Sequence, residues 1–270
     1  MAKPAGSKAE VGLPPGFVFA VLALLGLVAG SAVSAVAFRL PRGISWTVGR
    51  SRCTSCGAQL GALDLVPLFS YLLSRGRCRH CRASIGWRYP LTEVVCAAWT
   101  VLLYLKTGPV PAFPLLALWG YVLVTLMWID LDYQILPDEL TLLGTLLGLG
   151  AAFTVPGGGR EALWGIVLGS GVLWLLGWAY YKVRGVEGMG GGDVKLAAMF
   201  GAALGWKLTL VTLFLAALTG SVWGLALIAR HRGSGKTALP FGTLLAPAAM
   251  LACLWGAGWL ESYAGLFGRH

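Results

Sequence analysis

Residues 188–205 read GMGGGDVKLAAMFGAALG, a cluster of glycines that places Asp193 at the start of an apolar segment, Val194–Gly205. A second apolar segment, Leu115–Ile129, ends at another acid, Asp130. Ionisable groups are costly at membrane depth, and where they occur they usually have a function. The two segments therefore predict apolar helices in a membrane, with two acids at their ends that share a task.

The composition of the whole chain is that of a membrane protein. Of its 270 residues, 57% are hydrophobic and 12% are charged, and the mean hydropathy is +0.75. A soluble domain has about a quarter of its residues charged. A helix needs roughly 20 apolar residues to cross a bilayer. We predict an all-α polytopic membrane protein with about eight transmembrane helices. The expected spans are roughly 17–38, 89–105, 113–129, 139–155, 162–181, 194–205, 208–228 and 239–260. The first lacks a convincing cleavage site and is expected to be a permanent span.

Arginines are concentrated between the first two spans. The formal net charge is +10, and residues 39–88 hold nine arginines. Segments rich in Lys and Arg face the cytoplasm, so this insertion is predicted to be cytoplasmic. Asp130 and Asp193 then lie on the same face. No aromatic and basic reading surface accompanies the charge, so nucleic-acid binding is not expected. The chain divides into residues 1–38, the cytoplasmic insertion 39–88, and a transmembrane domain, 89–270.

The insertion contains two CxxC motifs, Cys53 with Cys56 and Cys78 with Cys81. Two such hairpins can hold one tetrahedral zinc ion, and cytoplasmic cysteines stay reduced. Because four thiolates leave no open position, we expect a structural zinc that stabilises a small domain with little apolar content. A pair of redox-active motifs is the alternative. His80 is expected to be exposed and not a ligand.

Four acids lie close together in the stretch that starts at Asp130. Asp130 follows the apolar segment directly, Asp132 is expected to be a solvated loop residue, and Asp138 is well placed to cap the next helix. Asp193 could also be a helix cap behind a flexible loop. The second acid on the same face makes that less favoured.

Two carboxylates that share a proton can hydrolyse a peptide bond. One activates a water molecule while the other, protonated, polarises the scissile carbonyl. The residues therefore favour an aspartyl protease. A serine or cysteine mechanism has poorer support, because no histidine lies near a plausible nucleophile. A proton-coupled transporter could also use two acids, but it would leave the zinc insertion without a role.

Taken together, the motifs resemble those of the bacterial type IV prepilin peptidases, which are GxGD aspartyl proteases. The resemblance covers nearly the whole chain and is specific in order and spacing. It rests on Gly30-Ser31, Arg39-Leu40-Pro41, the paired CxxC motifs with Pro67-Leu68-Phe69-Ser70-Tyr71 between them, Arg88-Tyr89-Pro90-Leu91-Thr92-Glu93, Ile129-Asp130 through Pro137-Asp138, Gly190-Gly191-Gly192-Asp193 with Val194-Lys195-Leu196, and Pro240-Phe241-Gly242.

This resemblance implies that Asp130 and Asp193 are the catalytic pair of a peptidase domain spanning residues 89–270. The enzyme would remove the basic leader of a type IV prepilin or type II secretion pseudopilin at the cytoplasmic face of the bacterial inner membrane. It would then N-methylate the new terminus with S-adenosylmethionine. Gly190 and Gly192 are candidates for binding the substrate backbone, and Glu93 for the methyltransferase site. Partners would include the bilayer, the prepilins and, on this resemblance, pilus or type II secretion assembly proteins.

The chain departs from the family pattern at Ser34, where asparagine is common, and at Thr243, where proline is common. Neither departure is expected to touch the acid pair. A peptidase without methyltransferase activity and another GxGD intramembrane protease are the alternatives that stay open.

Overall fold

The computed structural model describes residues 14–46, 48–186, 190–229 and 240–267. Within these ranges the only β-structure is two isolated bridges, so the predicted all-α class is confirmed there. The long helices are α1 (Pro15–Arg39), α3 (Arg88–Thr107), α4 (Ala112–Tyr133), α5 (Asp138–Phe153), α6 (Gly158–Arg184), α7 (Gly191–Ala229) and α8 (Phe241–Phe267). The insertion between α1 and α3 holds three short helices, η1 (Leu40–Arg42), η2 (Ala62–Asp64) and α2 (Phe69–Leu73).

Five helices, α1, α4, α6, α7 and α8, are long and apolar enough to cross a membrane. Helix α5 has 16 residues, which is shorter than the roughly 20 that a perpendicular crossing needs. The multi-pass character predicted from the sequence is therefore confirmed. The number of eight crossings stays a prediction.

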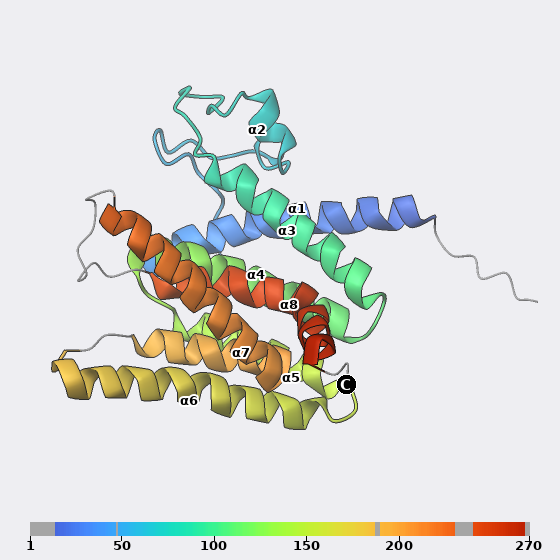
Figure 1. The fold of residues 1–270 in the computed structure, drawn as a ribbon. Helices are drawn as coiled ribbons and strands as arrows, with labels where there is room; N and C mark the ends of the chain where they lie inside the picture. The colour runs from blue at the N-terminus through green and yellow to red at the C-terminus, as the bar shows by residue number, and fades with distance from the viewer. Residues whose placement is uncertain (1–13, 47, 187–189, 230–239, 268–270) are drawn as a thin grey trace, which may run out of the picture.

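Helix α7 is broken at Gly205, where φ is 71° and ψ is 173°. A residue with a side chain rarely adopts this backbone conformation, so glycine is needed there. In Figure 1 the two halves of α7 run in opposite directions, and both of its ends lie at the same end of the bundle. The predicted boundary between the sixth and seventh spans falls at this break.

One end of the bundle, on the left in Figure 1, gathers the helix ends that carry the acids. The C-terminal ends of α1, α4 and α6 lie there, together with the N-terminal ends of α5, α7 and α8. The insertion joins the bundle at the same end through α1 and α3. This common placement is what the alternation of spans along the sequence predicts.

The core lies between α3, α4, α7 and α8, where Trp119, Phe200 and Leu245 are fully buried. Helices α1 and α6 instead expose large apolar side chains, among them Leu25 and Trp174. Burying such surface in lipid is favourable, and helices satisfy their own backbone groups there. The outer faces of the bundle therefore fit a hydrocarbon environment.

Two sequence predictions about the acidic stretch are wrong. Helix α4 continues to Tyr133, so Asp130 and Asp132 lie in its last turns and not in a loop. Asp138 does not cap α5: it is the first residue of that helix and makes no capping hydrogen bond. Its carboxylate instead pairs with the Lys195 ammonium of α7 at 2.7 Å.

Candidate functional site

Asp130 is a buried acid at the C-terminal end of α4, with 5% of the residue's surface exposed. Its Oδ2 accepts two hydrogen bonds from Thr243, one from the backbone N–H at 2.6 Å and one from the hydroxyl at 2.9 Å. Thr243 lies in the first turn of α8, where backbone N–H groups lack partners within the helix and favour negative charge. The start of α8 therefore fixes the orientation of Asp130.

This contact corrects the prediction that the departure at Thr243 does not touch the acid pair. Threonine supplies both a backbone N–H and a hydroxyl, and proline would supply neither. The sequence did contain one indication of this contact. Thr243 can donate a hydrogen bond, and it follows Phe241-Gly242, which belongs to the same family pattern as the two acids. The contact itself joins residues 113 positions apart, which no local pattern predicts.

Asp193 is the third residue of α7 and is half-buried. The helix begins at Gly191, so Asp193 is not its N-cap, and its own backbone N–H bonds to the Gly190 carbonyl at 3.1 Å. Its carboxyl group lies within electrostatic range of Asp130. The fold thus brings together the two acids that the sequence singled out, one from α4 and one from α7.

Leu136 fills the space between the glycines that flank the acids. A Cβ added to Gly192 would lie 3.0 Å from the Leu136 Cβ. One added to Gly242 would lie 3.0 Å from Asp130 Oδ2 and 3.2 Å from Leu136 Cδ1. A side chain at either position would be a tight fit, and its neighbours would have to move by a few tenths of an ångström. Gly190 is exposed and unhindered, and residues 188 and 189 of the same motif lie outside the described residues.

The four cysteines of the insertion converge in one cluster. Their sulfurs all lie within 4.8 Å of one another, and Cys53 Sγ and Cys81 Sγ are 3.9 Å apart. Four sulfurs about 2.3 Å from a central zinc ion would be separated by roughly 3.8 Å. The donor set therefore fits a tetrahedral zinc site with no open position. His80 is not part of the cluster, as predicted.

The two CxxC hairpins have the same backbone pattern. The Cys53 N–H donates to the Ala58 carbonyl and the Cys78 N–H to the Ala83 carbonyl, both at 2.9 Å. Backbone N–H groups of Cys56 and then Ser55 lower the pKa of Cys53 to about 6. The thiolate is the form that binds a metal, so Cys53 is the readier ligand, whereas desolvation and the neighbouring thiols raise the pKa of Cys81 to about 11.

Glu93 is a second buried acid. It lies on α3 next to the insertion, with 8% of the residue's surface exposed. Its Oε2 accepts a hydrogen bond from the Leu68 N–H at 2.7 Å, and Ser31 of α1 interacts with the same carboxylate. Glu93 does not pair with Arg88, whose guanidinium bonds to Asp132. Its partners come from α1 and the insertion, so it forms a site separate from the Asp130–Asp193 pair.

Comparison with known proteins identifies two matching regions. Residues 24–107 match the family model of the bacterial peptidase A24 N-terminal domain, and residues 115–225 match that of the type IV leader peptidase family. No solved structure matches the chain.

Several curated relatives are named prepilin leader peptidase/N-methyltransferase. The chain is 36% identical over 282 residues to one from Stutzerimonas stutzeri, covering 93% of this chain and 94% of the relative. It is 42% identical over 212 residues to one from Aeromonas salmonicida, covering 77% and 72%. It is 36% identical over 273 residues to one from Pseudomonas aeruginosa, covering 90% and 92%.

Proposed function

Because the chain belongs to the type IV leader peptidase family, we propose that its Asp130–Asp193 pair cleaves the leader peptide from prepilins or pseudopilins and that a second site N-methylates the new terminus. Relatives with both activities in their name align over almost the whole chain. The observation that carries the assignment of the pair is that α4 and α7 bring these two acids within electrostatic range at one end of the bundle.

The hydrogen bonds favour different roles for the two acids, with Asp130 as the base and Asp193 as the acid. Asp130 receives two donors from Thr243, and donors of this kind stabilise a carboxylate. Asp193 makes no side-chain hydrogen bond among the described residues and lies within electrostatic range of Asp130. In our proposal Asp130 takes a proton from the attacking water, and protonated Asp193 polarises the scissile carbonyl. As the C–N bond of the tetrahedral intermediate breaks, Asp130 gives this proton to the leaving amine, while Asp193 keeps its own proton, so both acids return to their starting states.

The proposed orientation places this end of the bundle at the cytoplasmic face of the inner membrane. It follows from the arginine-rich insertion, which joins the bundle at the same end as both acids. We propose eight crossings, with the two halves of α7 counted separately and α3 and α5 included. A prepilin helix in the bilayer would then present its leader junction beside Asp193 and the exposed Gly190. Pilus or type II secretion assembly proteins would meet the enzyme on this face.

Zinc and S-adenosylmethionine are the proposed cofactors. The cysteine cluster holds the zinc, which supplies structural stability and not chemistry, because all four ligands come from the protein. S-adenosylmethionine supplies the methyl group, and Glu93 is the candidate residue for its site.

Thr243→Val is expected to slow leader cleavage by about tenfold or more, because it removes one donor to Asp130 and keeps the side-chain shape. Thr243 is a positioning residue in this scheme, so the loss should fall on kcat with little change in KM. The measurement is steady-state cleavage of a purified prepilin across a pH range. Thr243→Ser retains a hydroxyl and should restore the rate. Equal rates for the valine and threonine enzymes would contradict the assigned role.

Gly242→Ala is expected to lower leader cleavage by about tenfold, since the new methyl group would crowd Asp130 Oδ2 while Thr243 holds that oxygen in place. Cleavage assays on the purified protein measure the effect. Gly258→Ala is the matched control on the same helix, because its Cβ meets nothing within 4 Å. If both alanine variants cleave at the normal rate, the packing of the acid site described above is wrong.

A further inference from the structure

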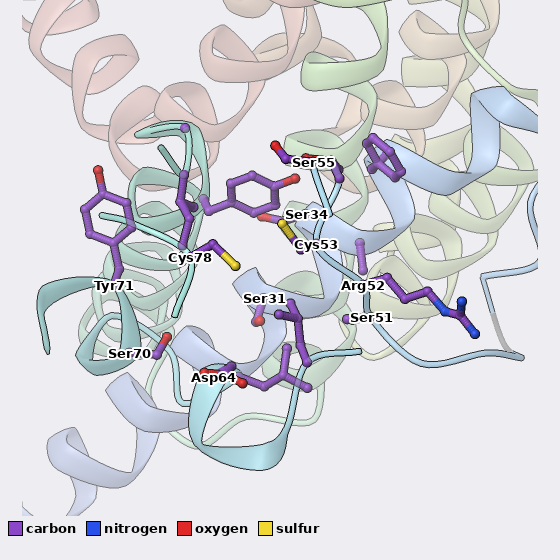
Figure 2. A pocket seen from close by; sticks show the side chains of 18 of the residues that line it. Ser31, Ser34, Ser51, Arg52, Cys53, Ser55, Asp64, Ser70, Tyr71 and Cys78 are labelled. Atoms are coloured by element: carbon purple, nitrogen blue, oxygen red, sulfur yellow. The ribbon is translucent and has the colours of Figure 1, made fainter. Parts of the chain in front are cut away.

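A cavity of about 460 Å³ lies between the insertion and helices α1 and α3. Figure 2 shows Ser31 and Ser34 on α1 turned toward the same space as Cys53, Asp64 and Cys78 of the insertion. Its volume is in the range of pockets that hold small molecules and cofactors. The cavity is built from elements that contribute nothing to the Asp130–Asp193 pair, so leader cleavage does not explain it.

The cavity is lined by two acids in different states. Asp64 is neutralised, because its Oδ1 lies 3.3 Å from the Arg79 guanidinium. Glu93 has no ion pair among the described residues, although only 8% of the residue's surface is exposed. A buried carboxylate without a cation is costly and attracts one. The charge of Glu93 therefore favours a cationic group beside it, although arginines line other positions of the cavity.

Close packing of α1 on α3 places further polar groups beside Glu93. A Cβ on Gly30 would lie 2.5 Å from the Glu93 Cα, so only glycine allows this approach. The next residue, Ser31, reaches the Glu93 carboxylate. One turn further on, the Ser34 hydroxyl is buried and has no hydrogen-bond partner among the described residues. An unsatisfied buried hydroxyl is costly, and a bound ligand would remove that cost.

The remaining lining combines apolar side chains with basic and hydroxyl groups. Phe38, Ile44, Leu65 and Ile85 are among the apolar residues. The basic residues include five arginines, Arg39, Arg50, Arg52, Arg77 and Arg79. Apolar walls with convergent polar groups are typical of sites that bind an organic cofactor. The cavity thus fits a ligand that combines a cationic centre, an anionic group and a flat apolar body.

We propose that this cavity is the binding site of S-adenosylmethionine and that Glu93, Ser31 and Ser34 are the polar groups that recognise it. The proposal rests on the proposed methyltransferase activity and gives it a location. The methyl donor carries a sulfonium cation, a carboxylate and an adenine ring, which match the unpaired Glu93 carboxylate, the arginines and the apolar side chains of the lining. The demethylated product, S-adenosylhomocysteine, lacks the cation and provides a direct probe of charge recognition.

The test is equilibrium binding of both compounds to the full-length, zinc-loaded protein in nanodiscs. The unaltered protein should bind S-adenosylmethionine more tightly than S-adenosylhomocysteine. Glu93→Gln should weaken S-adenosylmethionine binding about tenfold or more and remove the preference, because the charge is lost and the shape is kept. Ser34→Leu, which fills the cavity, should weaken both compounds. Ala32→Leu, at an exposed position on the same helix, is the matched control.

Unchanged affinity in both Glu93→Gln and Ser34→Leu would overturn the proposed location. Thermal unfolding and zinc content of each variant show whether a loss of binding comes from a loss of fold. Methyl transfer to a cleaved prepilin by the unaltered protein distinguishes a failure of the proposed binding site from a failure of the proposed methyltransferase function. If that protein methylates and the variants bind normally, the site lies elsewhere and the function stands. If it neither binds the donor nor methylates, the proposed second activity and its site both fail.

Discussion

Asp130→Asn and Asp193→Asn are each expected to reduce leader cleavage by about a thousandfold or more. The proposed chemistry needs one ionised and one protonated carboxyl group, and an amide can neither accept the proton from water nor supply one. Asparagine keeps the size of the side chain, so the packing of Asp130 against Gly242 is retained. Single-turnover cleavage of a purified prepilin measures the loss.

Asp132→Asn is the matched control for this experiment. Asp132 lies two residues from Asp130 on α4, but its carboxylate is at the surface and pairs with Arg88. An exposed ion pair contributes little to stability, about 0–1 kcal/mol, so cleavage should stay near normal. Binding of S-adenosylmethionine by Asp130→Asn and Asp193→Asn would show that the fold of each variant is intact. Cleavage within tenfold of normal in either of them would refute the paired mechanism.

The acid pair could be predicted because topology is a strong constraint on a membrane protein. Once the arginine-rich insertion sets the orientation, alternation of apolar spans puts the end of the third span and the start of the sixth on one face. The break at Gly205 was also visible, since a glycine stands where one apolar run gives way to the next. Both predictions depend on hydropathy and chain direction, which are properties of long segments.

The contacts within the site could not be predicted in the same way. Asp130 lies within α4 because the helix continues for about one turn beyond it. The helix ends at Tyr133, where Gln134 adopts a left-handed conformation with φ 54°. The bonds from Thr243 and the approach of Gly30 to Glu93 depend on how separate helices pack. Packing of this kind depends on the shapes of side chains from separate helices, and no repeating pattern in a single sequence predicts it.

Cys78→Ser is expected to remove the zinc and unfold the insertion, with loss of methyl transfer. Zinc binding contributes about 10–16 kcal/mol to small structural sites, which is as large as the whole stability of a typical domain. Cys78 is the most buried of the four cysteines, with 6% of its surface exposed, and the described residues of the insertion form no large apolar core that could replace the metal. Elemental analysis and limited proteolysis of the purified variant measure the two effects.

Loss of the insertion should affect the two activities unequally. The Leu68 N–H that donates a hydrogen bond to Glu93 belongs to the insertion. The proposed S-adenosylmethionine site would therefore be lost together with the zinc. Asp130, Asp193 and Thr243 come from α4, α7 and α8, so leader cleavage should fall less than methyl transfer. Cys253→Ala, a cysteine of α8 outside the cluster, should keep its zinc. A Cys78→Ser protein with full zinc and a protease-resistant insertion would contradict the four-thiolate site.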